Sequence, residues 1–365
     1  MNLPRAIINL NYFKQNLKYL QTISNDSKLY PVIKANAYGH GFKEIAKTIN
    51  SMNIDGVCVA TVNELKDLIN LNVKYSILHL GNIVFSDINI YENSNIIATV
   101  NSLDDVLKIS KMSSVDKLIR VHIKIDTGMS RMGCSINDFD KIFNMCLKVK
   151  KIKLEGIYSH LANSDNRYAK LNIKQIKEFE KIKNRINGKI NKFKYHLLNS
   201  GGLFNFAQNS YDLVRTGLSI YGVSPTGVIN KNLKPVMEFN APIILKKNII
   251  KGSMVGYANT FEAKSDMEIA IAQCGYGDGV PFEFSNEGFV FFKNYKIPII
   301  GRVSMDLICL DISSVKIEIN DYVTLWGSIE VNDSRLEKIS NKFKRIPYTF
   351  LTGVTQRVER VYIND

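Results

Sequence analysis

Between residues 29 and 215, eight short apolar runs alternate with stretches of helical spacing, and this alternation restricts the fold more than any other feature of the chain. In the intervening stretches apolar side chains recur every three or four positions, as Ile45 and Ile49 do, which is typical of one helical face. Eight strand–helix units in series are the number found in a closed parallel barrel, so the sequence predicts an α/β protein with a (β/α)8 TIM-like barrel. An open, doubly wound sheet remains the alternative, because a strand count from one sequence can be off by about one or two. The predicted strands are residues 29–33, 56–60, 75–80, 96–100, 119–125, 154–158, 195–198 and 212–215.

The sequence changes character after Pro235. Short β-rich runs separated by Gly, Asn and Asp turns replace the helical spacing, which predicts a mostly β C-terminal domain. A late helix is predicted over residues 334–343, with Ser334 as its N-cap. We expect a barrel domain over residues 1–235 and a β domain over residues 236–365. The strands predicted in the second domain are residues 269–274, 289–292, 297–300, 307–312 and 322–326.

Size and composition indicate a soluble protein. At 365 residues the chain is long enough for about two domains. With 45% hydrophobic and 22% charged residues, it falls in the soluble globular class. No apolar run approaches the roughly 18 residues of a membrane-spanning helix, so no membrane association is expected. The opening residues lack a basic segment followed by an apolar one, and we therefore expect a cytoplasmic protein.

Cysteine spacing and charge argue against several other classes of function. The five cysteines are widely scattered and form no C-x-x-C pair, which argues against a disulfide framework and a structural zinc site, and no metal is predicted. The net charge of +14 is spread along the chain without a basic block interleaved with aromatic residues, so no nucleic-acid partner is predicted. Such a charge helps to attract anionic ligands.

Lys34 stands out among the candidate functional residues. It closes the apolar run 29–33 and opens a segment of small residues and glycines, residues 34–41. An ammonium at the mouth of a buried strand loses hydration, so such a lysine is paired, chemically used or, most commonly, turned to solvent. The glycines and small residues that follow favour a loop that brings backbone close to a ligand. Lys34 is therefore a candidate Schiff-base lysine.

Polar residues follow the predicted barrel strands at the ends where the chemistry of such barrels gathers. The loops after the last two strands, residues 199–202 and 215–219, combine hydroxyl groups with backbone N–H groups suited to a phosphate. Either loop alone could be an ordinary helix N-cap with a glycine turn, but two of them on adjacent strands favour a phosphorylated cofactor. The polar residues are Lys34 after the first strand, Lys124 and Arg131 after the fifth, His160 after the sixth, Asn199 and Ser200 after the seventh, and Arg215 after the eighth.

Several segments resemble the alanine racemase family. Residues 32–41 resemble the segment that carries the family's pyridoxal phosphate lysine, and residues 124–133 match a second specific stretch. The pattern Arg-x-Gly-x-x-x-Tyr-Gly at residues 215–222 matches a third. The resemblance extends from Ala6 to Tyr362, and it implies a pyridoxal-phosphate-dependent enzyme. In the predicted β domain the matching segments are residues 255–261, 275–279 and 301–306.

The resemblance also implies where pyridoxal 5'-phosphate is bound. Arg215 would face the pyridine nitrogen, and because an arginine cannot accept a proton, the ring would stay neutral and the carbanion short-lived, which suits racemisation. His160 and His196 match a hydrogen-bonded chain between that arginine and the catalytic tyrosine, whereas His122 has no match and is assigned no role. The implied cofactor-binding residues are Lys34, Tyr38, His160, Asn199, Ser200, Arg215, Gly217 and Leu218.

A racemase needs acid–base groups on both faces of the substrate's α-carbon. The resemblance assigns the D side to Lys34 and the L side to Tyr257, and it implies that Tyr257 and Met305 reach the site from the partner subunit of a homodimer. Arg131 would bind the substrate carboxylate, and Met305 would touch the substrate. Lys124 matches a lysine that is commonly carbamylated and could then orient Arg131. The supporting residues are Lys124, His196, Tyr276, Asp306 and Gln356, the last of which replaces a tyrosine of several relatives.

The implied activity is interconversion of L-alanine and D-alanine, which supplies D-alanine for peptidoglycan. Serine or broader amino-acid racemisation is the nearest alternative, and Gln356 weakens the expectation of strict alanine selectivity. A decarboxylase of related fold would need cysteine-containing and glycine-rich signatures that this sequence lacks. A non-catalytic pyridoxal phosphate carrier would be a lone barrel without residues 236–365.

Overall fold

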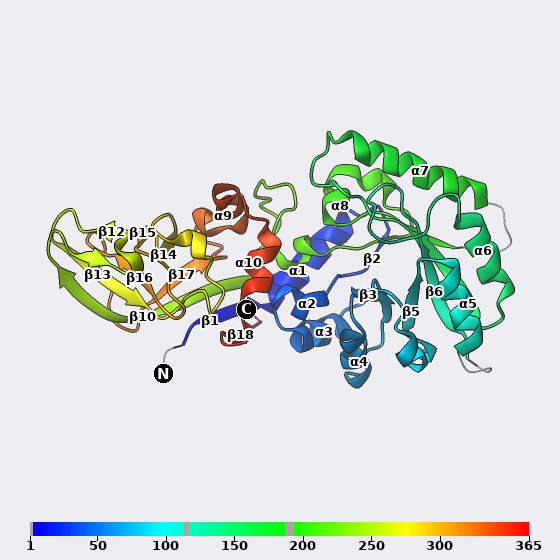
Figure 1. Cartoon of the computed structure of the whole chain (residues 1–365), viewed down its shortest axis with the longest axis horizontal. Helices are drawn as coiled ribbons and strands as arrows, with labels where there is room; N and C mark the ends of the chain where they lie inside the picture. Colours follow the sequence, from blue (N-terminus) through cyan, green and yellow to red (C-terminus); the bar gives the residue numbers. More distant parts are fainter. Residues whose placement is uncertain (1–2, 113–116, 187–192, 365) are drawn as a thin grey trace. The chain divides into compact units, whose positions relative to one another are not determined.

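The computed structural model describes residues 3–112, 117–186 and 193–364. The chain forms two compact units (Figure 1). One comprises Leu17–Ala37 and Phe42–Ile220 and is an α/β unit, and the other comprises Met1–Asn16, Tyr38–Gly41 and Tyr221–Asp365 and is mostly β.

Eight parallel strands close into a barrel in the α/β unit. Strands β3 to β8 form a parallel sheet in sequence order, and β2 pairs in parallel with β9. Backbone hydrogen bonds join the two sets at both edges: Cys58 N–H donates to Pro31 O at 2.8 Å, and Arg215 N–H donates to Leu198 O at 3.0 Å. The predicted (β/α)8 barrel is confirmed, and the open-sheet alternative is wrong because β2 and β9 join both edges of the larger sheet. The strands are β2 (Lys28–Leu29), β3 (Gly56–Val59), β4 (Ser76–His79), β5 (Ile96–Val100), β6 (Ile119–Lys124), β7 (Ile152–Tyr158), β8 (Lys194–His196) and β9 (Leu213–Val214).

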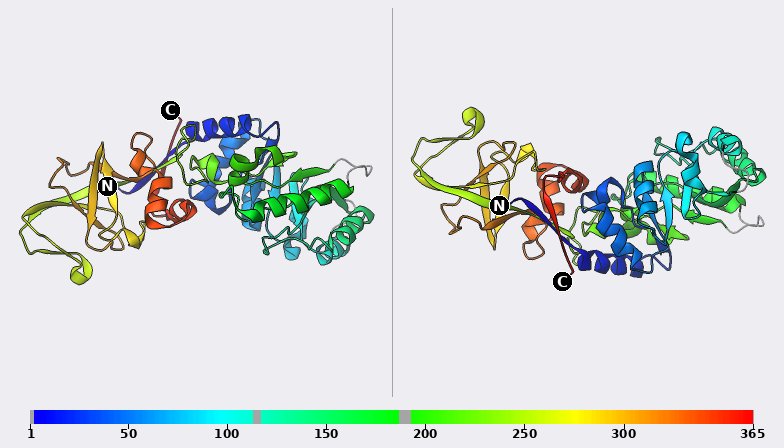
Figure 2. Two further views of the ribbon diagram at one scale, coloured as in Figure 1. Left: turned by 90° about the horizontal axis from the view of Figure 1, so that it is seen from above. Right: turned by 90° about the horizontal axis from the view of Figure 1, so that it is seen from below.

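Helices cover the outside of these strands, as two further views also show (Figure 2). Two of them show how an apolar face turns inward: α3 buries Ile45 and Ile49, and α6 buries Phe139, Ile142 and Phe143. Burying one such side chain contributes about 1.5–3 kcal/mol, so these faces hold the helices against the barrel. The helices up to residue 221 are α1 (Leu10–Thr22), α2 (Lys34–Tyr38), α3 (Phe42–Asn50), α4 (Val62–Asn70), η1 (Phe85–Glu92), α5 (Leu103–Met112), α6 (Phe139–Lys148), α7 (Lys170–Ile186), α8 (Ser200–Phe206), η2 (Ala207–Asn209) and η3 (Leu218–Tyr221).

The second unit is built on an eight-stranded sheet, which confirms the predicted mostly β region. The strand order is β13-β16-β15-β14-β17-β10-β1-β18, and β13 also pairs with β10, so the first six of these strands close on themselves. Trp326 and Phe239 are fully buried in this core with ring centroids 4.7 Å apart. The elements are β1 (Arg5–Asn9), β10 (Met237–Ile249), β11 (Met254–Val255), η4 (Tyr257–Asn259), β12 (Phe261–Glu262), β13 (Met267–Ala272), η5 (Phe282–Phe284), β14 (Phe289–Phe292), β15 (Tyr295–Ile300), β16 (Ile308–Asp311), β17 (Tyr322–Trp326), η6 (Asn332–Ser334), α9 (Leu336–Phe343), α10 (Pro347–Gly353) and β18 (Glu359–Ile363).

Three strands of this sheet do not follow from the sequence patterns. β1 lies near the start of the chain, yet it pairs antiparallel with β10 and parallel with β18 near the end. β10 is 13 residues long and contains Pro242, a residue that argues against a strand because it cannot donate to the ladder. The carbonyl of Pro242 still accepts a hydrogen bond from Gln273 N–H at 2.9 Å, so the strand continues through the proline.

The predicted helix near residue 334 is present, but its predicted cap is wrong. The helix is α9, and Arg335, not Ser334, occupies its N-cap position, where its side chain makes no capping hydrogen bond. Ser334 lies in η6, where its hydroxyl donates to Val331 O at 2.8 Å and to Ser328 O at 3.2 Å. Among the described residues, no N–H of α9 donates to this hydroxyl, so Ser334 does not cap the helix.

Within the described residues, no helix has the length and apolar character needed to span a membrane. Nor does this part of the chain hold a group of three or more His, Cys, Asp or Glu side chains that could bind a metal ion. The five cysteines are all free thiols, and Cys309 alone among them is not fully buried.

Candidate active site

Lys34 follows the first barrel strand and begins a left-handed turn. The turn is α2, in which residues 35–38 have φ between 52° and 55°. Left-handed backbone costs roughly 1–2 kcal/mol per non-glycine residue. Such strain persists where the surroundings hold it, and one such support is the hydrogen bond from Phe42 N–H to Asn36 Oδ1 at 2.8 Å. A strained turn beside a half-buried lysine is typical of a functional site.

Cationic groups gather at the ends of the barrel strands. Burial, followed by the charge of Arg131, lowers the pKa of Lys34 below its ordinary value. Burial, followed by the charges of Arg215 and Arg131, lowers the pKa of Lys124 to about 8. Glu64 acts on Lys34 in the opposite direction. An amine with a lowered pKa is more readily neutral, so it can act as a nucleophile or base, and the surrounding cations favour an anionic ligand.

A single carboxylate shapes the loop that carries Arg131. Asp126 Oδ1 accepts the backbone N–H groups of residues 128–130 at 2.8, 2.9 and 3.1 Å. The loop closes where Cys134 N–H donates to Lys124 O at 2.9 Å. Among the described residues, the Arg131 guanidinium forms no hydrogen bond or ion pair. Its donors are therefore available to a ligand.

Arg215 is 2% exposed and anchors a chain of hydrogen bonds. Its guanidinium donates to Ser159 O at 2.7 Å and to His196 Nδ1 at 2.5 Å. A guanidinium only donates, so His196 Nδ1 must accept, and the proton of His196 sits on Nε2. That Nε2 lies 2.8 Å from His122 Nδ1, which must accept in turn. Burial lowers the pKa of His122 to about 3, and burial followed by the charge of Arg215 holds the pKa of His196 well below its usual range, so both rings are neutral.

His122 is a member of this chain that the sequence patterns missed. It lies on β6 two positions before Lys124, and residues two apart on a strand share one face. That spacing could have suggested that both side chains point into the barrel. Its Nε2 is buried and has no hydrogen-bond partner among the described residues.

His160 lies beside Arg215, and Asn199 lies beside His160. His160 Nδ1 is 3.2 Å from Arg215 Nη2, and its Nε2 is 3.3 Å from Asn199 Nδ2. Asn199 is the N-cap of α8, where its Oδ1 accepts from Gly202 N–H at 2.9 Å and from Ser164 Oγ at 2.6 Å.

The two loops predicted to bind a phosphate meet at Ser200. Its Oγ accepts from Gly217 N–H at 3.0 Å and from Ser219 N–H at 3.4 Å, so its own proton remains to be donated. The buried hydroxyls of Thr216 and Ser219 have no hydrogen-bond partner among the described residues. A Cβ on Gly201 would lie 2.6 Å from Ser164 Oγ, so only glycine permits this close packing. Spare hydroxyl donors in adjoining loops fit a phosphate group.

The remaining predicted site residues belong to the mostly β unit. Loops 275–279 and 301–306 are joined by a hydrogen bond from Gly277 N–H to Met305 O at 2.9 Å. Thr355, next to Gln356, donates its hydroxyl to Gly277 O at 2.9 Å. Tyr276, Met305, Asp306 and Gln356 therefore come from loops that adjoin one another.

Tyr257 and Tyr38 have contrasting surroundings in the same unit. Tyr257 begins η4 and is 70% exposed. Val255, just before this turn, packs closely against Gly301, which begins the loop of Met305: a Cβ on Gly301 would lie 2.6 Å from Val255 O. The turn of Tyr257 therefore adjoins the loop of Met305. Tyr38 is buried and stacks on Tyr221 with ring centroids 5.0 Å apart.

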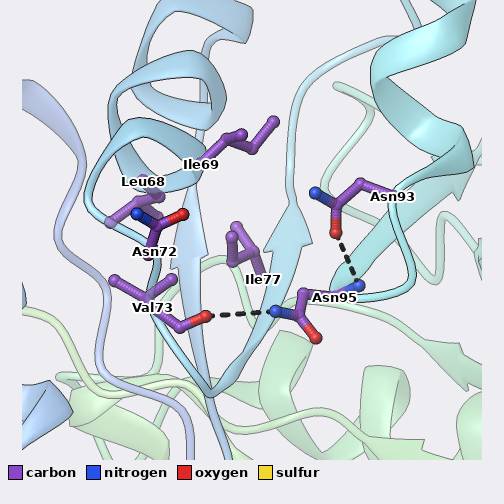
Figure 3. A pocket seen from close by; sticks show the side chains of 7 residues that line it. All are labelled: Leu68, Ile69, Asn72, Val73, Ile77, Asn93 and Asn95. Carbon is purple, nitrogen blue, oxygen red and sulfur yellow. Dashed lines mark hydrogen bonds between the residues drawn. The ribbon is translucent and has the colours of Figure 1, made fainter.

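A pocket of about 200 Å³ in the α/β unit lies away from these groups (Figure 3). Its lining residues come from the end of α4, from the start of β4 and from the loop before β5. The pocket therefore lies at the amino ends of β4 and β5, whereas Lys34 lies at the carboxyl end of the barrel strands. One lining amide, Asn95 Nδ2, donates to Val73 O at 3.1 Å, and Asn95 N–H donates to Asn93 Oδ1 at 2.9 Å. Residues at this end of a barrel generally serve stability.

Sequence profiles of two domains match the chain. The alanine racemase N-terminal domain matches residues 8–225, and the alanine racemase C-terminal domain matches residues 236–362. The fold and its strand-end cluster thus define a barrel enzyme that acts on amino acids as an isomerase. The chain belongs to the alanine racemase family.

Individual relatives are similar over nearly their whole length. Alanine racemase of Vesicomyosocius okutanii is 35% identical over 351 residues, which are 96% of each chain. Alanine racemase 2 of Caldanaerobacter subterraneus is 32% identical, over 98% of this chain and 94% of the relative. Among solved structures, alanine racemase from Bartonella henselae with covalently bound pyridoxal phosphate has a TM-score of 0.90 at 30% identity over all of both chains. Alanine racemase of Clostridium difficile 630 has a TM-score of 0.91 at 28% identity, over 100% of this chain and 97% of the other.

Proposed function

We propose that this enzyme interconverts L-alanine and D-alanine with pyridoxal 5'-phosphate as its cofactor. The observation that carries the proposal is Lys34, an amine with a lowered pKa at the end of a barrel strand, beside Arg131 and within one strand-end cluster with Arg215. The covalently bound pyridoxal phosphate in the Bartonella henselae relative supports the choice of cofactor.

The residues present fit this cofactor. Lys34 would hold its carbonyl carbon, and Arg215 would face its pyridine nitrogen, with His160 beside the guanidinium. A guanidinium can donate but not accept a proton, so the ring nitrogen stays unprotonated. Bound there, pyridoxal phosphate supplies an electron sink for the substrate's α-carbon. The proposed phosphate ligands are Tyr38, Asn199, Ser200, Gly217 and Leu218.

Two residues move the proton. Lys34 takes it from, or returns it to, the D face of the α-carbon, and Tyr257 does so at the L face. Arg131 binds the substrate carboxylate with donors that no described residue engages. Lys124, whose lowered pKa leaves its amine more readily neutral, is the amine that we propose is carbamylated to orient Arg131.

The L-side base comes from a second copy of the chain. Tyr257 is 70% exposed and Met305 is 52% exposed, as expected of side chains that meet a ligand or partner. We propose a homodimer in which residues 1–235 bind the cofactor and residues 236–365 provide Tyr257 and Met305 to the partner's site. The part of the site that contains Tyr257 and Met305 is supported by Tyr276, Asp306 and Gln356.

In the cell the proposed product is D-alanine for peptidoglycan, made in the cytoplasm. Serine is the nearest competing substrate, since a side-chain difference of one small group changes binding by only about 1–3 kcal/mol. A decarboxylase or a non-catalytic carrier is opposed by the full-length similarity to alanine racemases.

The test is chiral analysis of a panel of L-amino acids incubated with the purified chain and pyridoxal phosphate. L-alanine should reach an equal mixture of enantiomers, with solvent deuterium at the α-carbon and no release of carbon dioxide. Faster inversion of L-serine would move the assignment to a serine or broad racemase. A protein that binds pyridoxal phosphate but inverts nothing would be a carrier.

A further inference from the structure

Glu64 makes contacts that a helix cap alone does not need. It is the third residue of α4 and forms a capping box with Thr61, which is the N-cap. Its Oε2 accepts from Thr61 N–H at 3.0 Å and from Ala60 N–H at 2.7 Å. Its Oε1 accepts from Ala35 N–H at 2.7 Å. The cap uses one oxygen, and the other reaches into a different strand–helix loop.

The third bond fixes the peptide that follows Lys34. The N–H of Ala35 belongs to the peptide unit joined to the Lys34 carbonyl, so holding it sets the backbone direction at Lys34. The same peptide opens the left-handed turn of residues 35–38, which has φ values that alanine and tyrosine seldom adopt. A turn of this kind needs restraints from outside, and Glu64 supplies one from α4.

Glu64 also contributes charge to Lys34. The charged and titratable groups that act on Lys34 are the cation Arg131, the carboxylate Glu64 and the thiol of Cys58. Lys34 in turn acts on Lys124 and His160. Glu64 is the carboxylate that acts on Lys34, so it offsets part of the repulsion that Lys34 receives from Arg131.

We propose that Glu64 is a positioning residue: its carboxylate ties the end of β3 to the turn after β2 and thereby holds Lys34 in place for covalent attachment of the cofactor. This inference deepens the proposed function and rests on it for the cofactor. Catalytic contact is made by Lys34, and Glu64 acts through the backbone of Ala35.

Two substitutions separate the tether from the cap. Glu64→Asp keeps a negative charge in the first turn of α4 but shortens the side chain by one methylene. It should therefore lose the hydrogen bond from Ala35 N–H. Thr61→Ala removes the hydroxyl that accepts Glu64 N–H at 3.3 Å and leaves the bond to Ala35 intact. Both changes weaken the same capping box, so a role confined to the helix predicts similar behaviour.

Hydrogen exchange of the backbone tests the tether without the cofactor. In cofactor-free protein, Glu64→Asp should speed exchange in a peptide that covers residues 34–38 by about tenfold or more, whereas Thr61→Ala should change it by less than about twofold. Equal exchange in the two variants would overturn the proposal, even if the wild-type chain turned out to bind no pyridoxal phosphate.

Cofactor attachment tests the consequence. Mixing cofactor-free protein with pyridoxal phosphate and following its absorbance should show attachment slowed about tenfold or more in Glu64→Asp and nearly unchanged in Thr61→Ala. Glu64→Gln keeps the length of the side chain but has only one acceptor oxygen, so its attachment rate should fall between those of the other two variants. This variant provides the measurement if Glu64→Asp does not fold. Attachment in Glu64→Asp and Glu64→Gln at the wild-type rate would refute the positioning role, whereas failure of the wild-type chain to bind the cofactor would refute the proposed function instead.

Discussion

His196 Nδ1 accepts a hydrogen bond from the Arg215 guanidinium, and this one contact fixes the position of the proton on the imidazole. Because Arg215 has only donors, the chain of bonds runs one way, from Arg215 to His196 to His122. It ends at His122 Nε2, a buried nitrogen with no partner among the described residues. This chain of hydrogen bonds holds Arg215, the arginine that is proposed to face the cofactor. Both histidines in it are neutral.

The two histidines should differ in their effect on stability. His196→Leu removes the acceptor of a charged donor and the donor to His122, so we expect a loss of about 2–4 kcal/mol in the free energy of unfolding. His122→Leu leaves His196 Nε2 unpaired but also removes the unpaired Nε2 of His122, so the net loss should be within about 1 kcal/mol. Urea unfolding of both variants measures the difference. Equal losses would contradict the one-way chain.

Much of the fold follows from local patterns. β5, β14 and β17 have the predicted bounds, because each is a short apolar run between turns. All eight predicted barrel strands are present. They could be predicted because an apolar run and a helical face are each patterns of residues close together in the sequence. β1 and β18 were missed because their partners lie at the opposite end of the chain, and β10 because Pro242 argues locally against a strand.

The sequence predicts the functional site less completely than it predicts the fold. The cations at the strand ends were predicted, because the strands place them at one rim of the barrel. Their supports were not, because a carboxylate at the third position of a helix, such as Glu64, reads as an ordinary cap. The bond from Glu64 to Ala35 joins residues 29 positions apart and depends on the left-handed turn, which no local pattern predicts.

Tyr257→Phe should abolish racemisation while leaving cofactor binding intact. The substitution removes only the phenolic oxygen, and removing an acid–base group typically costs about 10²–10⁴-fold in rate. Because Tyr257 is 70% exposed, the change should not alter the thermal unfolding temperature. Chiral analysis gives the rate and cofactor absorbance gives occupancy. Full activity in this variant would remove Tyr257 from the mechanism.

Mixed dimers should test whether sites are shared. Lys34→Ala and Tyr257→Phe homodimers should both be inactive, but a dimer with one chain of each type has one site with both bases intact. Random mixing should therefore restore about a quarter of the wild-type sites. Activity after unfolding and refolding the two variants together, with each refolded alone as the control, measures this recovery. No recovery would contradict a site built from two chains.

The pKa of Lys124 predicts a pH-dependent change in stability. Burial and the charges of Arg215 and Arg131 lower it from 10.5 to about 8, so folding disfavours the charged amine. Below about pH 8 both the folded and unfolded states hold the proton, and the folded state carries the full penalty. Between about pH 8 and 10.5 the unfolded state binds more protons, so wild-type stability from this group rises with pH.

Lys124→Met, which keeps the chain length without the charge, should therefore be more stable than wild type at pH 7, by an amount on the order of 2–3 kcal/mol. This advantage should shrink as the pH rises from 8 towards 10.5. Urea unfolding at several pH values, in buffers freed of carbon dioxide so that the amine stays unmodified, measures it. Lys148→Met, at an exposed position at the end of α6, is the matched control and should show no such trend. An advantage that stays constant with pH would mean that folding does not lower the pKa of Lys124, and it would contradict the effect of burial and of the two arginines.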